Sequence, residues 1–338
     1  MNREQDHVLV VAEAGVNHNG DINLAHKLID VAAEAGADIV KFQTFHAESV
    51  ISACAPKAAY QQKTTETDES QLDMVRKLEL PEEDFVALKK HCDERGIVFW
   101  STAFDLASVD FLHNLGLKLW KIPSGEITNL PYLRKIGQYQ DEIVLSTGMA
   151  TLGDIETALS ILEHAGTQRK SIMLLHCTTE YPAPLEDVNL HAMQTVRNAF
   201  PGICGVGYSD HTEGIEIALA AVAMGAQFIE KHFTLDKQME GPDHKASLDP
   251  QELTALVTGV RHVCTALGDG IKKPTAIEMQ NRIVARKSLV ASTAICKGEL
   301  LGEHNMTVKR PGSGISALRW DEFCGQKAER DYNVDELI

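Results

Sequence analysis

The sequence lacks the features that mark several classes of protein. No apolar run approaches the roughly 18 residues needed to cross a membrane, and the N-terminus has no basic segment leading into a long apolar stretch, so no secretory signal is expected. The seven cysteines are scattered and include no Cys-x-x-Cys pair, which argues against a disulfide framework or a thiolate zinc site. We therefore expect a soluble, cytoplasmic protein with reduced thiols.

Positive charge is also scarce. The chain of 338 residues carries 32 Lys and Arg against 48 Asp and Glu, a net charge of −16 that argues against a nucleic-acid surface. Residues 284–338 hold eight of each sign, so the whole excess lies on residues 1–283. The apolar pattern also changes near residue 286 to short strands and turns. These two shifts predict a large domain over 1–270, a linker over 271–285 and a small β-rich module over 286–338.

Eight short apolar runs, most of them rich in β-branched residues, alternate with amphipathic segments. They are 8–15, 38–45, 97–104, 117–126, 142–149, 171–181, 204–211 and 228–235. Eight β-then-α units predict a (β/α)₈ barrel of about 250 residues. A doubly wound open sheet also alternates strands and helices, but no Gly-x-Gly-x-x-Gly follows any run, as a dinucleotide-binding sheet would have after its first strand.

Almost every predicted strand ends in polar residues. They are Glu13, Lys41, Gln43, Ser101, Thr102, Lys121, Ser124, Glu126, Ser146, Thr147, 178–181, 209–211, Lys231 and His232. In a barrel the carboxyl ends of all strands surround one opening, where barrel enzymes place their chemistry. The long connection over 46–80 follows the second strand, and we expect it to form a flap over that opening.

Two histidines end the neighbouring seventh and eighth strands. His211 and His232 can therefore converge on one ion, and two imidazoles with water or substrate oxygens suit Mn, Fe, Co or Zn better than Mg. A hydrogen-bonded histidine without a ligand is the alternative for each. Asp243, just past the eighth strand, is a further ligand, a substrate contact or a turn residue.

Two lysines end the second and fourth strands and point inward by alternation. A buried cation needs a partner, so Lys41 and Lys121 predict either an anionic ligand or an ion pair with Glu13 or Glu126. Hydroxyl groups alongside favour a phosphate or carboxylate site. They belong to Ser124, Ser146 and Ser209.

Four more side chains carry open alternatives. Glu13 and Glu126 serve as general acid and base if burial raises a pKa, or simply balance the lysines. Tyr181, in a rigid Pro-containing loop, faces a ligand or packs. Arg310, beside a flexible turn in the small module, is solvated or reaches an anion or amide on another surface.

Motifs along almost the whole chain resemble those of the sialic acid synthases, which condense phosphoenolpyruvate with an N-acylated mannose-type sugar. They are GVNHNG, KFQTF, KIPSGE, LSTGM, LLHCTTEYP, GYSDHT, EKHFTLD, GPDH and KRPGSGIS. The resemblance implies a TIM barrel followed by an antifreeze-like (SAF) domain. It also implies a homodimer that exchanges this domain, so that Arg310 enters the partner's active site.

The resemblance also implies roles for the residues above. His211 and His232 would bind Mn²⁺, with Mg²⁺ or Co²⁺ as alternatives, and Glu13 and Glu126 would manage the attacking water and its protons. Phosphoenolpyruvate and the sugar would contact Lys41, Gln43, Thr102, Lys121, Ser124, Ser146, Thr179, Tyr181, Ser209, Asp243 and Arg310.

Within this family the chain is more similar to the bacterial legionaminic acid synthases, which use 2,4-diacetamido-2,4,6-trideoxymannose. Thr179 stands where the N-acetylneuraminate branch often has Asn, and the segment 58–72 and the run PSGEITNLPYL support the same branch. N-acetylneuraminate synthesis from N-acetylmannosamine is the nearest alternative. Synthases of eight-carbon acidic sugars would need further cations for a second phosphate, and a non-catalytic carbohydrate- or ice-binding protein would not need His211 and His232.

Overall fold

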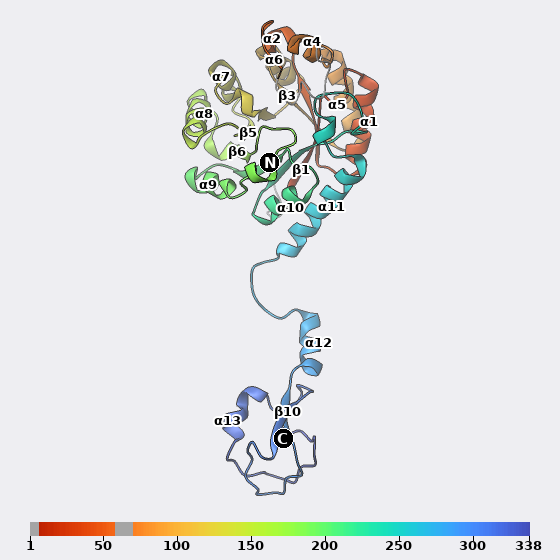
Figure 1. Cartoon of the computed structure of the whole chain (residues 1–338). Helices are drawn as coiled ribbons and strands as arrows, with labels where there is room; N and C mark the ends of the chain where they lie inside the picture. Colours follow the sequence, from red (N-terminus) through yellow and green to blue (C-terminus); the bar gives the residue numbers. More distant parts are fainter. Residues whose placement is uncertain (1–6, 58–69) are drawn as a thin grey trace. The chain divides into compact units, whose positions relative to one another are not determined.

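The computed structural model describes residues 7–57 and 70–338 and divides the chain into two compact units at Gly268 (Figure 1). Each unit is described by itself below. Residues 58–69 lie outside the described ranges, and with them most of the 58–72 segment on which the branch resemblance partly depends. No described helix is long and apolar enough to span a membrane.

The first unit is a barrel of eight parallel strands. They are β1 (Leu9–Gly15), β2 (Ile39–Thr44), β3 (Val98–Ala103), β4 (Leu119–Ile122), β5 (Glu142–Ser146), β6 (Ile172–His176), β7 (Gly205–Asp210) and β8 (Phe228–His232). The hydrogen-bonded order is β3-β2-β1-β8-β7-β6-β5-β4. The two ends of this order lie side by side, and the Trp100 indole N–H of β3 donates to the Leu119 carbonyl of β4 at 2.6 Å. The closed ring confirms the predicted barrel over the open sheet.

Helices surround the strands (Figure 1). They are α1 (Ile22–Glu34), α5 (Glu82–Arg95), α6 (Leu106–Asn114), α7 (Leu130–Gln138), α8 (Leu152–Ala165), α9 (Ala192–Ala199), α10 (Glu216–Ala223) and α11 (Pro250–Leu267), with the short α2 (Ala47–Val50) and α4 (Gln71–Arg76) after β2. Local sequence sets several starts. Thr151 and Asp154 form a capping box at α8, and Asp249 and Glu252 form one at α11.

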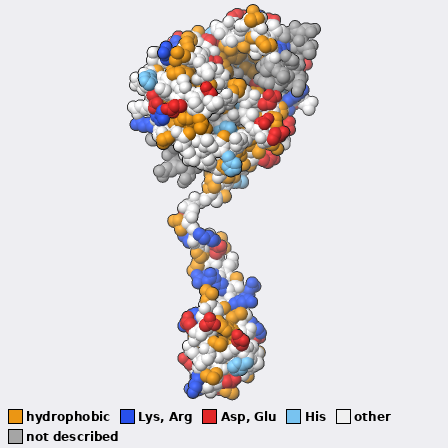
Figure 2. All heavy atoms as spheres, turned by 60° about the vertical axis from the view of Figure 1, so that its left-hand side comes forward, with side chains coloured by type: hydrophobic (Ala, Val, Ile, Leu, Met, Phe, Trp, Pro, Cys, Tyr) orange, Lys and Arg blue, Asp and Glu red, His pale blue; other side chains and the backbone are white. Residues whose placement is uncertain are grey.

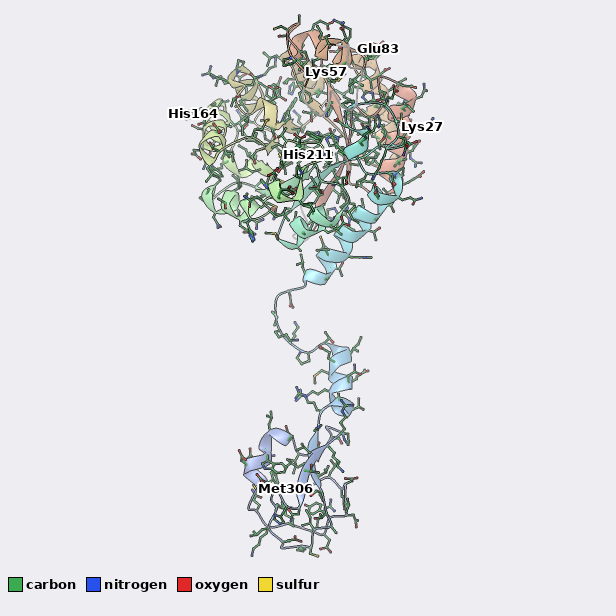
Figure 3. The ribbon with its side chains drawn as sticks, in the orientation of Figure 1. Lys27, Lys57, Glu83, His164, His211 and Met306 are labelled. Atoms are coloured by element: carbon green, nitrogen blue, oxygen red, sulfur yellow. The ribbon has the colours of Figure 1, made fainter. Side chains whose placement is uncertain are left out.

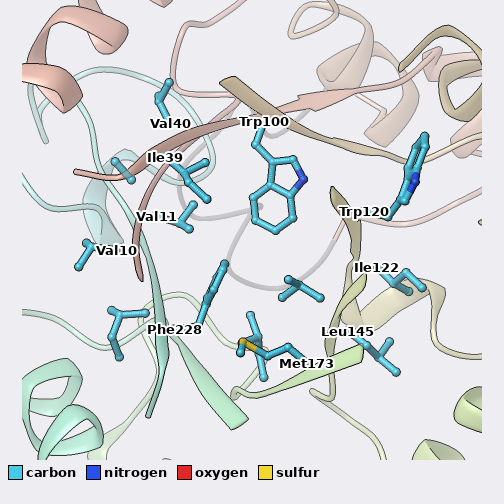
Figure 4. Close-up of a cluster of buried hydrophobic side chains, with 14 of the residues drawn as sticks. Val10, Val11, Ile39, Val40, Trp100, Trp120, Ile122, Leu145, Met173 and Phe228 are labelled. Carbon is cyan, nitrogen blue, oxygen red and sulfur yellow. The ribbon is translucent and has the colours of Figure 1, made fainter. Parts of the chain in front are cut away.

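The interior of the barrel is filled by side chains that follow the two-residue period of the strands. Trp100 and Phe228 meet edge to face there, with ring centroids 6.0 Å apart, and Val11 and Met173 pack nearby (Figure 4). Residues two positions further along the same strands point to the same axis but lie nearer the carboxyl end. The hydrophobic core therefore forms the floor beneath whatever lies at that end, which we call the mouth of the barrel.

A fully buried ion pair joins the two strands that carry the candidate metal ligands. Lys231 Nζ of β8 lies 2.7 Å from Asp210 Oδ2 of β7 and 2.6 Å from the Thr212 carbonyl oxygen, and neither charged side chain is exposed. Both residues alternate away from the mouth, so Lys231 holds strand ends together rather than lining the site. The pair fixes His211 and His232, the sequence neighbours of Asp210 and Lys231, on adjacent strands.

The loop after β1 is fastened to the loop after β8. Asn17 Nδ2 donates to the Phe233 carbonyl oxygen at 2.8 Å and to Ser247 Oγ at 2.9 Å. Asn19 Nδ2 donates to the Glu240 carbonyl oxygen at 2.8 Å. These bonds hold the segment that carries Asp243 against the mouth.

His18 lies between these two asparagines and is fully buried. Its Nδ1 accepts a hydrogen bond from the backbone N–H of Gly20 at 3.1 Å, so the neutral ring carries its proton on Nε2. Burial lowers the pKa of His18 to about 4. The loop is therefore built around a neutral imidazole.

The second unit, Asp269–Ile338, contains α12 (Ala276–Ala285), β9 (Ser288–Ala291), β10 (Met306–Lys309) and α13 (Trp320–Phe323). β9 and β10 pair in antiparallel fashion over a small core that includes Ile295 and Met306. This confirms the predicted small β-rich module. No residue of α12, all of which is described, is buried, and hydrophobic side chains lie on its surface (Figure 2).

Replacement of Lys231 by Met should destabilise the barrel by about 3–5 kcal/mol, because it leaves the Asp210 carboxylate buried without its cation. Urea unfolding followed by circular dichroism measures this loss. Lys89→Met breaks an exposed pair with Asp93 on α5 and serves as the control, with an expected change below about 1 kcal/mol. Equal effects of the two substitutions would show that the buried pair does not stabilise the barrel.

The pH dependence of folding should report the buried imidazole of His18. Its pKa is about 4 in the folded chain against 6.5 for the ordinary group, so the unfolded chain binds more protons between these values and stability falls as pH drops from 6.5 towards 4. The loss amounts to about 3 kcal/mol. The unfolding free energy of His18→Asn should therefore fall less than that of the unsubstituted chain over this window. The exposed His164→Asn should follow the unsubstituted chain; parallel curves for all three would contradict this origin.

Candidate active site

A cavity of about 310 Å³ opens at the mouth of the barrel, where His211 lies near the centre of the first unit (Figure 3). The strand ends contribute Glu13, Lys41, Gln43, Thr102, Lys121, Ser146, Ser209, Glu230 and His232 to its lining. The loops that follow contribute Ser124, Cys177, Thr179, Tyr181, His211 and Asp243. The structure thus brings together most of the polar residues predicted from the sequence.

A cluster of four buried charged side chains forms the centre of this cavity. Lys41 Nζ lies 2.7 Å from Glu13 Oε2 and 3.6 Å from Glu230 Oε2, and Lys121 Nζ lies 2.6 Å from Glu230 Oε1. The Lys41 ammonium also lies 5.7 Å from the centroid of the Trp100 ring, which belongs to the hydrophobic floor. Glu230 is therefore the carboxylate that both lysines share.

Neighbouring polar groups complete the cluster. Lys41 Nζ donates to Thr102 Oγ1 at 2.9 Å, Gln43 Nε2 donates to Glu13 Oε1 at 3.1 Å, and Ser209 Oγ donates to Glu230 Oε1 at 2.9 Å. Thr102, Gln43 and Ser209 thus orient the charged groups and still face the cavity.

Burial and neighbouring charges give Glu13 and Glu230 different pKa values. Burial raises the pKa of Glu13 to about 7, although Lys41 opposes the shift. Burial also acts to raise the pKa of Glu230, but the charges of Lys121 and Lys41 outweigh it and hold that pKa well below its usual range. Glu230 is therefore ionised, whereas Glu13 can take up or release a proton near neutral pH.

The pKa values of the two lysines are shifted in opposite directions. Burial lowers the pKa of Lys121 despite its bond to Glu230. For Lys41, burial acts downwards, but two carboxylates at close range raise the pKa overall. With Glu13 protonated, two ammonium groups share the single negative charge of Glu230, so the cavity has a net attraction for a small anion.

Hydroxyl groups line the side of the cavity formed by β4, β5 and β6. The backbone N–H of Gly148 donates to Ser124 Oγ at 2.9 Å, and a Cβ added at Gly148 would lie 2.3 Å from Thr179 Oγ1 and 2.8 Å from Ser124 Oγ. Any larger residue would displace these two hydroxyl groups. Ser146 is buried on the same side, and Thr179 Oγ1 has no hydrogen-bond partner within the described residues. Serine and threonine hydroxyls beside Lys121 suit the oxygens of a phosphate group.

The two histidines converge beside these hydroxyl groups, at the ends of the neighbouring strands β7 and β8. Their ring centroids lie 5.7 Å apart, and Tyr181 packs on both, at 4.2 Å from His211 and edge-on at 5.7 Å from His232. Burial lowers the pKa of both imidazoles, that of His232 well below its usual value. His211 Nδ1 lies 2.6 Å from the Thr178 carbonyl oxygen, to which only a protonated nitrogen can donate, so the lone pair of the neutral ring is on Nε2, 3.4 Å from Ser209 Oγ.

This arrangement fits a metal held by two neutral imidazoles. His232 Nδ1 is buried without a hydrogen-bond partner in the described part of the chain, as expected of a group that awaits a ligand. No group of three or more His, Cys, Asp or Glu that could hold a metal is found over residues 7–57 and 70–338. The remaining coordination positions would therefore belong to water or to substrate oxygens.

Three residues stand apart from the predictions made from sequence. Glu126, in a short 3₁₀ turn, is absent from the described lining, and its Oε2 accepts a hydrogen bond from Asn129 Nδ2 at 2.6 Å. Arg310 is exposed in the second unit, where its Nε donates to the Ala285 carbonyl oxygen. Glu230 was missed, although it lies two residues before His232 on β8 and the strand period alone places it inward.

Asp243 lines the cavity, as predicted, from the loop fastened by Asn17 and Asn19. Burial raises the pKa of its carboxyl to about 6. A carboxyl accepts hydrogen bonds from the hydroxyl or amide groups of a ligand when it is ionised, and donates one when it is protonated.

Comparisons with known proteins agree with this geometry. Residues 28–272 match the NeuB family and residues 286–338 match the SAF domain. The chain is 60% identical to an N,N'-diacetyllegionaminic acid synthase of Campylobacter jejuni, over 98% of each chain, and 44% identical to one of Legionella pneumophila, over 97% of this chain and 92% of the other. It is also similar to the crystal structure of an N-acetylneuraminic acid synthetase from Leptospira borgpetersenii, with a TM-score of 0.69, 37% identity, and coverage of 81% and 90%.

Proposed function

Because the chain belongs to the NeuB family, we propose that it is a nonulosonic acid synthase. It condenses phosphoenolpyruvate with an N-acylated mannose-type sugar and releases phosphate. The product is N,N'-diacetyllegionaminate, as the name of the Campylobacter jejuni relative suggests, and the sugar that we propose for it is 2,4-diacetamido-2,4,6-trideoxymannose. The observation that carries this proposal is the buried Lys41–Glu230–Lys121 cluster between a row of hydroxyl groups and a pair of neutral histidines.

Phosphoenolpyruvate is the anion that this cluster holds. Its phosphate lies against Lys121 and the hydroxyls of Ser124 and Ser146, and its carboxylate lies near Lys41 and Ser209. Thr102 and Thr179 supply further donors. The positive charges of the two lysines offset the repulsion between the phosphoenolpyruvate trianion and the Glu230 carboxylate. Glu230 in turn stabilises the protonated, charged form of both lysines.

His211 and His232 hold a divalent metal, Mn²⁺ by preference, with Mg²⁺ or Co²⁺ as alternatives. When bound, such an ion polarises the aldehyde of the open-chain sugar. Gln43, Tyr181 and Asp243 contact and orient that sugar from three sides of the cavity.

The reaction forms one carbon–carbon bond and breaks one carbon–oxygen bond. C3 of phosphoenolpyruvate attacks the aldehyde carbon, the aldehyde oxygen takes up a proton to become a hydroxyl, and positive charge is left at C2. Water adds to C2 and gives one proton to the ionised form of Glu13, whose pKa near 7 suits a proton acceptor at neutral pH; this proton replaces the one taken up by the aldehyde oxygen. Phosphate then leaves with the bridging oxygen and the proton of the new C2 hydroxyl, and C2 becomes a ketone. A role for Glu126 in these proton transfers stays a prediction.

The nearest alternative function is N-acetylneuraminate synthesis from N-acetylmannosamine, which the similarity to the Leptospira borgpetersenii synthetase favours. Both reactions use the same phosphoenolpyruvate site. They differ in the groups at C4 and C6 of the sugar, so they are distinguished by the sugar alone.

We also propose that two chains share their active sites. The second unit of one chain presents Arg310 to the cavity of its partner, and the apolar side chains of α12, such as Ile277 at 72% and Val284 at 63% exposure, gain cover in the dimer. The free thiols at all seven cysteine positions support work in the reducing cytoplasm.

Phosphate release from phosphoenolpyruvate tests the reaction. We expect release to require both a divalent metal and a sugar, with the diacetamido trideoxy sugar preferred over N-acetylmannosamine and arabinose 5-phosphate inert. A chelator should stop release and Mn²⁺ should restore it. Release without any sugar, or with none of the three, would contradict the synthase; a rate unaffected by chelator would contradict the role of His211 and His232.

Mixing two inactive variants tests the shared site. Arg310→Ala and Lys41→Ala chains should each be inactive as pure dimers. In a mixed dimer, one cavity receives intact Lys41 and an intact partner Arg310, so activity should recover towards one working site in two. No recovery after confirmed subunit exchange would show that the second unit does not act across chains.

A further inference from the structure

A small hydrophobic cluster lies at the mouth of the barrel, separate from the main core. Its buried members are Val16, Phe45 and Leu78, and its partly buried members are Val50, Val75 and Phe104. All six side chains line the active-site cavity, and none carries a polar side-chain atom. We call these six residues the apolar wall.

The wall occupies one sector of the mouth. Val16, Phe45 and Phe104 directly follow β1, β2 and β3, and the rings of Phe45 and Phe104 meet edge to face at 6.5 Å. The other three residues come from the connection after β2, where α2 carries Val50 and α4 carries Val75 (Figure 1). The two short helices pack against each other.

The rest of the cavity is graded around the barrel. Ser124, Ser146 and Thr179 lie at β4 to β6, charged groups lie at the centre, and His211 and His232 lie at the ends of β7 and β8. Gln43, Thr102 and Gln71 also line the cavity, on the same side as the wall. The wall therefore faces the side of the cavity where the proposed phosphate does not lie. A ligand that fills the whole cavity must be charged or polar at one end and apolar at the other.

Hydroxyl or phosphate groups against this wall would lose water without gaining a hydrogen bond from its six side chains, whereas a methyl group would gain contact with them. In the proposed reaction the aldehyde lies between the phosphoenolpyruvate carbon and the histidine pair. Because β8, which carries His232, pairs with β1, which leads into Val16, a sugar bound in this way can place its far end against the wall.

We propose that the apolar wall binds the C6 methyl group of a 6-deoxy amino sugar and makes the enzyme discriminate against sugars with a C6 hydroxyl. This assignment rests on the proposed condensation of phosphoenolpyruvate with such a sugar. It identifies the wall residues as determinants of specificity, distinct from the groups that act on the reacting atoms. A hydrophobic pocket of this kind distinguishes a methyl-bearing ligand from its hydroxylated analogue by about 10- to 100-fold.

Two sugars that differ only at C6 provide the test: 2,4-diacetamido-2,4,6-trideoxymannose and 2,4-diacetamido-2,4-dideoxymannose. The measured quantity is the ratio of kcat/KM for the deoxy sugar to kcat/KM for the hydroxylated sugar, in the full-length chain with Mn²⁺. We expect a ratio of at least about 10. If both sugars react equally well, the wall does not select a methyl group although the synthase function stands. If neither reacts, the proposed function itself is wrong, and the assignment of the wall with it.

Val16→Thr keeps the shape of the side chain and exchanges one methyl for a hydroxyl within the wall. It should reduce the ratio by about tenfold, chiefly through KM for the deoxy sugar. Val75→Thr makes the same exchange on α4, at a half-buried position that tolerates it if Val16→Thr impairs folding. Val98→Thr, at 56% exposure at the start of β3, is the matched control and should leave the ratio unchanged. An unchanged ratio in both folded wall variants would overturn the assignment.

Discussion

Two buried ammonium groups at the mouth of the barrel are the constraint on which the rest of the site depends. Lys41 and Lys121 are each 3% exposed, and an unpaired charge at such a position would destabilise the fold by several kcal/mol. Glu230 pairs with both lysines and stays ionised, while burial raises the pKa of Glu13 in the same volume to about 7. When Glu13 is protonated the two lysines are only partly neutralised and attract a small anion; when it is ionised it can accept a proton.

The barrel provides this constraint through strand geometry. Val11, Trp100 and Phe228 point into the core of the barrel. Because side chains repeat their direction every two residues, the polar residues two positions further along these strands point inward above that core. The Lys231–Asp210 pair, on the opposite parity of β7 and β8, fixes the strand ends that present the two histidines. The hydrophobic floor excludes water from beneath the charged cluster. The Lys231–Asp210 ion pair fixes the distance between the ends of β7 and β8.

Sequence alone was sufficient for the barrel and for most of the polar lining, since both follow from apolar periodicity and from the polar residues that end each strand. The same two-residue period predicts that Glu230 points inward, since it lies two positions before His232. It is not among the predicted site residues because it lies inside the strand and not at its polar end. The position of Glu126 depends on a 3₁₀ turn that directs its side chain to Asn129, which no periodicity reveals. The apolar wall could not be predicted either, because only the tertiary folding of the connection after β2 brings Val75 into the same cluster as Val16.

The central claim is that this cluster supports condensation of phosphoenolpyruvate through cleavage of its carbon–oxygen bond. It is tested most directly with phosphoenolpyruvate labelled by ¹⁸O at the bridging oxygen, incubated with the diacetamido trideoxy sugar and Mn²⁺. Mass spectrometry of both products locates the label. The account predicts ¹⁸O in the released phosphate and none in the sugar acid, since water supplies the new oxygen at C2. Label retained in the sugar acid would mean that the phosphorus–oxygen bond breaks, and would contradict the account.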